Sequence, residues 1–218
     1  MLLGCSAVAG LFSKDDVVGT PVEQVGAGPA RGAFLYEPGV VHDFGLALSD
    51  ESVAALTADP HSPVPATFTW QGESYAVSVH LKGHHSFRDL TAKAPFKIDF
   101  HEFDPLATFH GVRRLTLNNM IQDGSMLAES GAYRFFAEMG LPAPRHGFAR
   151  VAVNGVPFGL YGIVETSDEQ LLDQFESDEG NLYAGGYGGD VLPGNATNFE
   201  LEEAGDAAEP FVDLDALC

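Results

Sequence analysis

Two stretches of alternating apolar and polar residues, each broken by a tight turn, limit the fold of this chain more than any other feature. In residues 64–83 the alternation runs on both sides of the turn Gln71-Gly72-Glu73. In residues 148–166 it runs on both sides of Asn154-Gly155, which is a strong signal for a two-residue turn between antiparallel strands. The sequence therefore predicts two β-hairpins.

The other predicted elements set the fold class. Residues 96–100 (FKIDF) and 112–119 (VRRLTLNN) read as strands, and about Ser125 to Met139 reads as a helix with a broad apolar face. Short helices are predicted directly after Ser49 and after Ser167. The order is hairpin, strand, strand, helix, hairpin, helix, which predicts an α+β domain with an antiparallel sheet and a packed helix.

Residues 116–136, TLNNMIQDGSMLAESGAYRFF, form the junction between a strand and the long helix. Asp123 or Ser125 is the expected N-cap, because its side-chain oxygen can accept from free backbone N–H groups. Asn118 and Asn119 can close the strand end by bonding nearby backbone. The same residues would suit the edge of a phosphate or metal site, but capping is a sufficient account of Asp123 and Ser125.

Charge is distributed unevenly along the chain. The formal net charge is −20, all eleven Lys and Arg lie at or before Arg150, and residues 151–218 contain fifteen Asp and Glu but no Lys, Arg or His. Such a surface argues against nucleic acid and anionic membranes, because phosphate contacts need cations. We favour a solvated acidic face over a metal-attracting one.

The first 31 residues read as a leader or tether, with Leu2-Leu3-Gly4-Cys5 resembling a bacterial lipobox. A signal peptide needs a basic start and a longer apolar stretch. Either the start is internal to a longer reading frame or the match is chance, and we favour an exported protein with a lipid anchor at Cys5. Cys5 and Cys218 suggest neither a disulfide framework nor zinc, and no stretch is long and apolar enough to span a membrane.

Several separated runs resemble the spore coat protein H (CotH) kinase family. They are VHLKGHHSFR, KAPFKIDF, FHGVRRLTLNNMIQDGSMLAESGAY, GLPAPRHGFARVAVNGVPFGLYGIVE and GNLYAG, over roughly residues 60–190. The resemblance implies a protein-kinase-like fold that uses ATP with Mg²⁺ or Mn²⁺ to phosphorylate Ser or Thr of secreted or coat proteins. Many bacterial relatives are predicted lipoproteins or exported proteins, which agrees with the leader.

The resemblance also implies what this chain does not contain. The family's metal-binding and catalytic-base acids follow the GNLY block in a second lobe, whereas this sequence stops at FVDLDALC, and we assign Asp213 and Asp215 no catalytic role. We therefore expect a leader at 1–31, an N-lobe-like domain at 32–190 and a truncated acidic segment at 191–218, inactive alone. Two alternatives stay open: a non-catalytic surface or coat-assembly binding protein, and a fragment of a longer gene.

The basic loop after residue 81 is the first candidate for a phosphate clamp. Phosphoryl transfer needs cations on the phosphates, and Lys82, Ser86 and Arg88 could meet phosphate oxygens around a turn at Gly83. The alternative is an ordinary solvated loop. His84-His85 has no ligand partners at a metal-site spacing, so we reject zinc.

The strand that follows gives the second candidate. In a kinase-like lobe a strand lysine reaches the phosphates and a helix glutamate orients it, which suggests Lys93 or Lys97 with Glu129. Lys97 lies opposite the packed face of its strand, but the resemblance does not separate the two lysines, and either could be an ordinary surface lysine. Glu165 lies near the end of residues 161–166, where the resemblance places a hinge that would contact adenine through its backbone.

Overall fold

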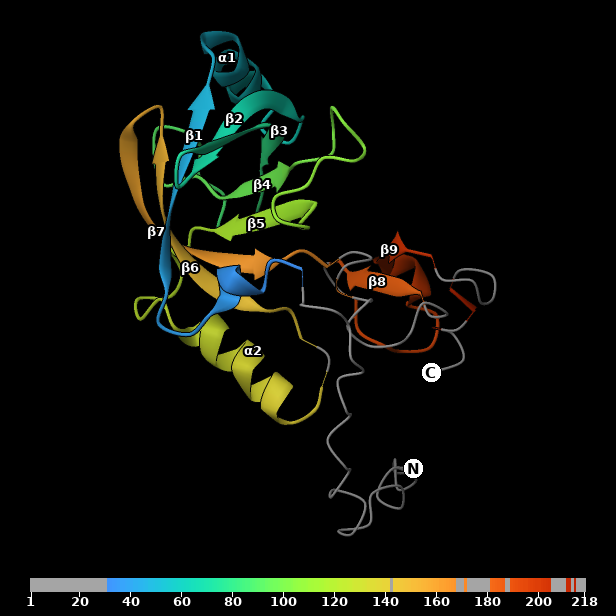
Figure 1. Cartoon of the computed structure of the whole chain (residues 1–218). Coiled ribbons are helices and arrows are strands. Elements are labelled where there is room, and N and C mark those ends of the chain that lie inside the picture. The colour runs from blue at the N-terminus through green and yellow to red at the C-terminus, as the bar shows by residue number, and fades with distance from the viewer. Residues whose placement is uncertain are drawn as a thin grey trace, which may run out of the picture.

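The computed structural model describes residues 31–141, 143–167, 171, 181–186, 189–204, 211–212 and 214 (Figure 1). Its strands are β1 (Val41–Leu48), β2 (Val64–Trp70), β3 (Glu73–Leu81), β4 (Phe96–Asp99), β5 (Arg114–Asn118), β6 (His146–Val153), β7 (Val156–Glu165), β8 (Leu182–Gly185) and β9 (Phe199–Glu203). Its α-helices are α1 (Asp50–Ala58) and α2 (Ala128–Glu138), and its 3-10 turns are η1 (Ala33–Tyr36) and η2 (Ala196–Asn198).

Seven of these strands form a closed barrel in the order β1-β2-β3-β4-β5-β7-β6. In Figure 1, α1 lies at the top of the barrel and α2 lies below β6. Strands β8 and β9 form a separate two-stranded sheet. Their pairing joins residues on the two sides of the domain boundary that the sequence places at residue 190.

Both predicted hairpins are confirmed. Strands β2 and β3 pair antiparallel up to Trp70 and Glu73, and the two turn residues between them have positive φ angles of 48° and 88°. Strands β6 and β7 meet in the same way around Asn154 and Gly155, with φ angles of 50° and 78°. Two consecutive left-handed residues match the right-handed twist of the flanking strands, which is why glycine follows a polar residue at each turn.

The predicted fold class is wrong. The protein is mostly β, with a closed seven-stranded barrel and two short α-helices among the described residues, rather than an α+β domain with kinase-like N-lobe architecture. The closure is a parallel pairing of β1 with β6, from Val41 opposite Phe148 to Leu46 opposite Val153. Alternation within a strand shows which side chains face inward, but it does not show which distant strand lies alongside.

The barrel encloses a core rich in aromatic side chains. Phe109 lies in the connection between β4 and β5 and is fully buried. Around it, with ring centroids 5.1 to 6.4 Å away, are Phe34, Phe44, Phe68, Trp70, Tyr75 and Phe100. The aromatic cluster belongs to a larger core that also includes Val151 of β6 and Ile163 of β7, so both hairpins and η1 share one core.

Helix α2 does not pack as predicted. Its apolar periodicity predicts a buried face, yet none of its residues is buried, and Phe135 and Met139, which directly follows the helix, are 59% and 57% exposed. The physical reason is the closure of the barrel, because a closed sheet fills its interior with its own side chains and leaves no apolar face for a helix to cover. Among the described elements, β6 is the one against which the helix mainly packs.

The predicted N-cap of α2, Asp123 or Ser125, is wrong, because the helix begins at Ala128 rather than near Ser125, although both side chains do accept from backbone N–H groups at its start. Leu127 occupies the N-cap position. Asp123 Oδ2 accepts from the backbone N–H of Ala128 at 2.7 Å, and Ser125 Oγ accepts from that of Leu127 at 3.1 Å. Both side chains therefore satisfy free N–H groups of the first turn from further upstream. These bonds hold the pKa of Asp123 at about 2, with the Ser125 hydroxyl contributing most.

The other predicted helices and the leader have different outcomes. The helix after Ser49 is confirmed as α1, and the Ser49 hydroxyl accepts from the backbone N–H of Ser52 at 3.1 Å. The helix predicted after Ser167 and the leader with Cys5 fall outside the described residues. None of the helices that the structure describes has the length and apolar character needed to cross a membrane.

Candidate functional site

One outer face of the barrel carries several polar and charged side chains. In β4, Phe96 and Ile98 point into the core, while Lys97 and Asp99 alternate with them on the outside. Lys97 lies opposite His80 on β3 and opposite Thr116 on β5. Three neighbouring strands therefore present polar side chains on the same face, with Lys97 in the middle.

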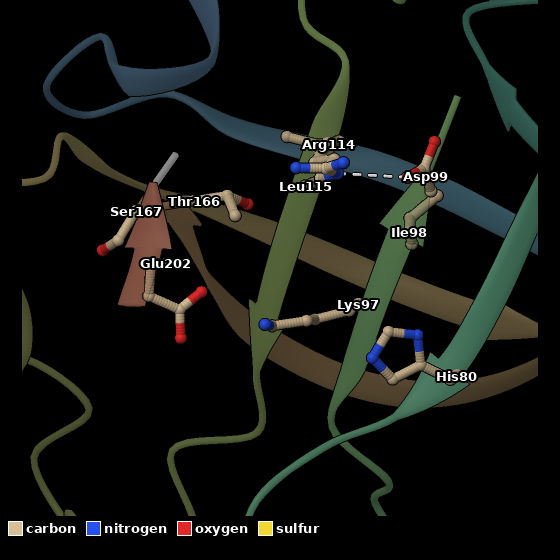
Figure 2. Close-up of a pocket in the computed structure, with 9 residues that line it drawn as sticks. All are labelled: His80, Lys97, Ile98, Asp99, Arg114, Leu115, Thr166, Ser167 and Glu202. Carbon is tan, nitrogen blue, oxygen red and sulfur yellow. Dashed lines mark hydrogen bonds and ion pairs between the residues drawn. The ribbon is translucent and has the colours of Figure 1, made fainter. Parts of the chain in front are cut away.

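A small pocket opens on this face, next to strand β9 (Figure 2). Its lining residues are His80, Lys97, Ile98, Asp99, Arg114, Leu115, Thr166, Ser167 and Glu202. Its volume of about 160 Å³ is below the roughly 300 to 1,000 Å³ of most small-molecule sites. A phosphate group fits within it, whereas a whole nucleotide would extend beyond it.

Lys97 is the cation that projects into the pocket. Figure 2 shows its side chain reaching across from β4 toward the side where Glu202 of β9 lies. No hydrogen bond or ion pair joins its ammonium to another described residue. By contrast, Arg114 is engaged at the pocket wall, where its Nε donates to Asp99 Oδ2 at 3.1 Å. Among the described residues, Lys97 therefore has no partner that an incoming anion would have to displace.

A hydrogen-bonded chain of three side chains lies beside Lys97 on the same face. Lys82 Nζ donates to Asn118 Oδ1 at 2.6 Å, and Asn118 Nδ2 donates to Glu129 Oε1 at 2.7 Å. The amide orientation is determined by its partners, because an ammonium can only donate and a carboxylate can only accept. Asn118 thus joins a lysine to the glutamate of α2.

The ionisation of this chain reflects its partial burial. Burial and, after it, the positive charge of Lys97 lower the pKa of Lys82 to about 8, while Glu129 acts in the opposite direction. Burial also opposes the charge on Glu129, but contacts with His146 and Asn118 outweigh it and lower the pKa of that carboxyl. The formal charges on this face balance, because Lys82, Lys97 and Arg114 are matched by Glu129, Asp99 and Glu202.

The backbone of the loop after β3 is held by hydrogen bonds from a side chain elsewhere in the chain. Gly83 has a φ of 94°, and a Cβ there would lie 2.7 Å from Ser86 Oγ. Asn119, which is 1% exposed, donates to the carbonyl oxygens of Ser86 and Lys93 at 2.8 Å each. Asn119 therefore bonds backbone as the sequence predicts, although that backbone is about 30 residues away in the chain.

The structure brings together three of the seven predicted site residues: Lys82, Lys97 and Glu129. The helix glutamate connects to Lys82 through Asn118 rather than to either of the two lysines between which the resemblance left the choice. Ser86 lies in the tethered loop, and the exposed Arg88 donates to the carbonyl of the residue before it at 2.5 Å. Neither lines the pocket.

Lys93 and Glu165 lie elsewhere. The Lys93 ammonium is 5.0 Å from the ring centroid of Tyr161, and burial lowers its pKa. Glu165 is 4% exposed and accepts from Arg145 Nε at 3.0 Å and Nη2 at 2.5 Å. Its side chain is turned away from the pocket into a buried ion pair.

Several lining residues were not predicted from the sequence. The period-two pattern of β3 would have placed His80 on the outer face, because it alternates with buried Val79 and Leu81. Thr166 and Ser167 follow β7 and reach the pocket through the pairing of β5 with β7. Glu202 could not have been predicted as a lining residue, because no sequence pattern shows that β9 lies next to the barrel.

Comparison with known proteins finds a family match that includes the residues of this pocket. The family model described as "CotH kinase protein" matches residues 79–214. Over 121 residues the chain is 30% identical to inner spore coat protein H of Bacillus subtilis (strain 168), covering 56% of this chain and 32% of the relative. An inner spore coat protein H-like protein of the same strain is 34% identical over 74 residues, 34% of this chain and 22% of the relative. The chain spans about a third or less of these relatives.

Proposed function

Since the chain belongs to the CotH kinase protein family, we propose that it forms part of an ATP-dependent protein kinase whose phosphate site is the outer face around Lys97. The observation that carries this proposal is the arrangement of two lysines on one face. Lys97 is open to an anion, and Lys82 is tied through Asn118 to Glu129. Cations preorganised in this way stabilise the charge of phosphate groups.

Each residue of the proposed phosphate site would have a different role. Lys97 would contact a phosphate oxygen directly, since its ammonium already projects into the pocket. Lys82 would supply a second positive charge, and Asn118 and Glu129 fix its direction. Thr166 and Ser167 offer hydroxyl groups at the opposite wall. ATP would supply the transferred phosphoryl group.

The described residues do not fit the divalent metal that the resemblance implies. Among them, no three His, Cys, Asp or Glu side chains lie close enough together to hold a metal ion. Mg²⁺ and Mn²⁺ bind chiefly through carboxylate and phosphate oxygens. We therefore assign no step to the metal within this part of the chain.

The relatives' names support a location and a class of partner. Both are called inner spore coat proteins or proteins like them. We propose a location at a spore coat or cell envelope, with a coat or exported protein as the phosphorylated substrate. A lipid anchor at Cys5 stays a prediction, because that residue is outside the described part of the chain.

Replacing Lys97 by methionine is expected to weaken ATP binding by about ten- to a hundredfold, since hydrogen bonds between charged groups contribute roughly 1.5–3 kcal/mol. Lys93→Met is the matched control. It removes the same charge four residues away, from an ammonium that lies over Tyr161, and should change affinity less than about threefold. Calorimetric titration with ATP and Mg²⁺ or Mn²⁺ measures both.

An equal loss in the two variants would contradict a site at Lys97. Absence of ATP binding in the folded wild-type chain would instead favour the alternative function, a non-catalytic surface or coat-assembly protein. One observation supports that alternative independently, namely the exposed apolar side chains of Phe135 and Phe136 on α2 and of Met139 just after it. Such a patch is typical of a protein-binding surface.

The affinity for ATP is expected to fall as the pH rises from 7 to 9. Lys82 has a pKa of about 8, so it is mostly protonated at pH 7 and mostly neutral at pH 9. A bound anion favours the ammonium and raises this pKa, so that affinity decreases by up to about tenfold per pH unit above 8. The last ionisation of a phosphate group has a pKa of about 6, so it is largely complete by pH 7 and adds little change within this window.

Calorimetry at several pH values, on the wild type and on Lys82→Met, tests this dependence. The variant should bind more weakly at pH 7 and should show a nearly flat profile between pH 7 and 9. A profile of the same steepness in Lys82→Met would show that another group is responsible.

A further inference from the structure

The imidazole of His146, at the start of β6, is a buried polar group that the proposed clamp does not use. Its side chain is 3% exposed, and neither ring nitrogen has a hydrogen-bond partner among the described residues. Buried polar groups without partners are uncommon in folded proteins and call for a physical reason. Within the described part of the chain, the charged group paired with it is Glu129, whose Oε2 is 3.7 Å from His146 Nε2.

Gly162 of β7 provides the space for this contact. A Cβ at Gly162 would lie 2.7 Å from His146 Nε2 and 3.4 Å from Glu129 Oε2. Its φ is not in the left-handed region, so glycine is required here for room and not for backbone conformation. The imidazole and the carboxylate therefore approach each other over the backbone of Gly162, with no side chain between them.

The two oxygens of Glu129 have different neighbours. Oε1 accepts from Asn118 of β5, and Oε2 faces His146 of β6. Since α2 has no buried residue, these polar contacts determine much of where the start of the helix lies. A separation of 3.7 Å is too long for a hydrogen bond, and a small shift of α2 toward β6 would form one.

We propose that His146 is a positioning residue: its Nε2 lies 3.7 Å from Glu129 Oε2 and comes within donating distance on a small shift of α2 toward β6, and this contact keeps the Glu129 carboxylate on Asn118. The other groups facing the imidazole are Tyr133 of α2, with ring centroids 6.3 Å apart, and Phe148 of β6, at 4.9 Å. The effect on phosphate binding rests on the proposed function, whereas the effect on Lys82 does not.

The test compares His146→Leu with His146→Gln. Glutamine places an amide N–H close to the position of imidazole Nε2 and should rescue the contact, whereas leucine fills similar space without a donor. In the leucine variant Glu129 is freed from His146 and withdraws from Asn118, so the pKa of Lys82 should fall below about 8, because Glu129 raises it. The glutamine variant should keep the wild-type value.

The titration of Lys82 is read by NMR of lysines carrying ¹³C-methyl groups, without nucleotide. In parallel, the Kd for ATP at pH 7 should rise by about five- to tenfold in His146→Leu and much less in His146→Gln. Denaturant unfolding of each variant measures stability. A purely structural role would lower the unfolding midpoint of the leucine variant and leave the titration of Lys82 unchanged, which would overturn the proposal.

A second variant keeps the test decisive if His146→Leu does not fold. Glu129→Gln should lower the pKa of Lys82 directly, and in that background His146→Gln and wild-type His146 should give the same titration. A further change on altering His146 without an ionised Glu129 would also overturn the proposal. A shift of Lys82 as expected, with no ATP binding in any folded variant, would support the positioning role and contradict the proposed kinase function.

Discussion

Replacing Phe109 by alanine is expected to lower the free energy of unfolding by about 3–5 kcal/mol, the range measured for large-to-small changes at buried aromatic residues. Phe109 is fully buried and stacks on Phe100, with centroids 5.3 Å apart and an interplanar angle of 15°. The rings around it come from η1, β1, β2 and β3, so no single neighbour can move to fill the space. The cavity should therefore persist in the variant.

The control for this prediction is Phe103→Ala. Phe103 lies in the same connection between β4 and β5 but is 56% exposed, so its removal should cost less than about 1 kcal/mol. Urea unfolding measures both, with the midpoint shifting and the slope unchanged. If Phe109→Ala leaves too little folded protein, Phe109→Leu should show a smaller loss in the same direction. Similar costs for Phe109→Ala and Phe103→Ala would contradict the position of Phe109 in the core.

Replacing Arg145 by methionine is expected to cost about 3–5 kcal/mol, because it removes the guanidinium that pairs with the buried Glu165 carboxylate. Glu165 is 4% exposed and also accepts from the backbone N–H of Arg145 at 3.0 Å. The guanidinium further lies 4.5 Å from the ring centroid of Tyr36. Loss of Arg145 therefore removes a charge partner and a stacking contact together.

Arg150→Met is the matched control for the second prediction. Arg150 pairs with Asp43 through Nε and Nη2, but both side chains are about two-thirds exposed, at 67% and 69%. Exposed pairs contribute roughly 0–1 kcal/mol. Adding Glu165→Leu to Arg145→Met should recover part of the stability, since an apolar pair can replace a buried ion pair. If Arg145→Met costs no more than Arg150→Met in urea unfolding, the burial of Glu165 is wrong.

Local structure was largely predictable from the sequence. The turn residues Gln71-Gly72 and Asn154-Gly155 have chemistry that suits a single backbone geometry, so both hairpins could be predicted, although Glu73, expected in the first turn, belongs to β3. The cap at Ser49 followed from the same kind of local argument. The closure of the barrel depends on β1 meeting β6, and no local pattern encodes which of several similar strands becomes the partner.

The site was partly predictable for the same reason. Strand alternation put Lys97 on the outer face, and the turn at Asp123 placed Glu129 in the first turn of α2. The choice of Lys82 as the lysine joined to Glu129 depends on Asn118, whose side chain bridges β3 and α2 only after β4 and β5 have paired. The apolar face of α2 misled the prediction, because periodicity shows that a face is apolar but not whether anything covers it.

The parallel pairing that closes the barrel also has a consequence during synthesis. Strand β1 is made about a hundred residues before β6, which at roughly 5–20 residues per second is an interval of about 5–20 s on the ribosome. Throughout that interval one edge of β1 has no neighbour and exposes backbone groups that can pair with another nascent chain. The risk of aggregation is thus highest before Val153 has been made, and a chain cut short of β6 would keep the open edge permanently.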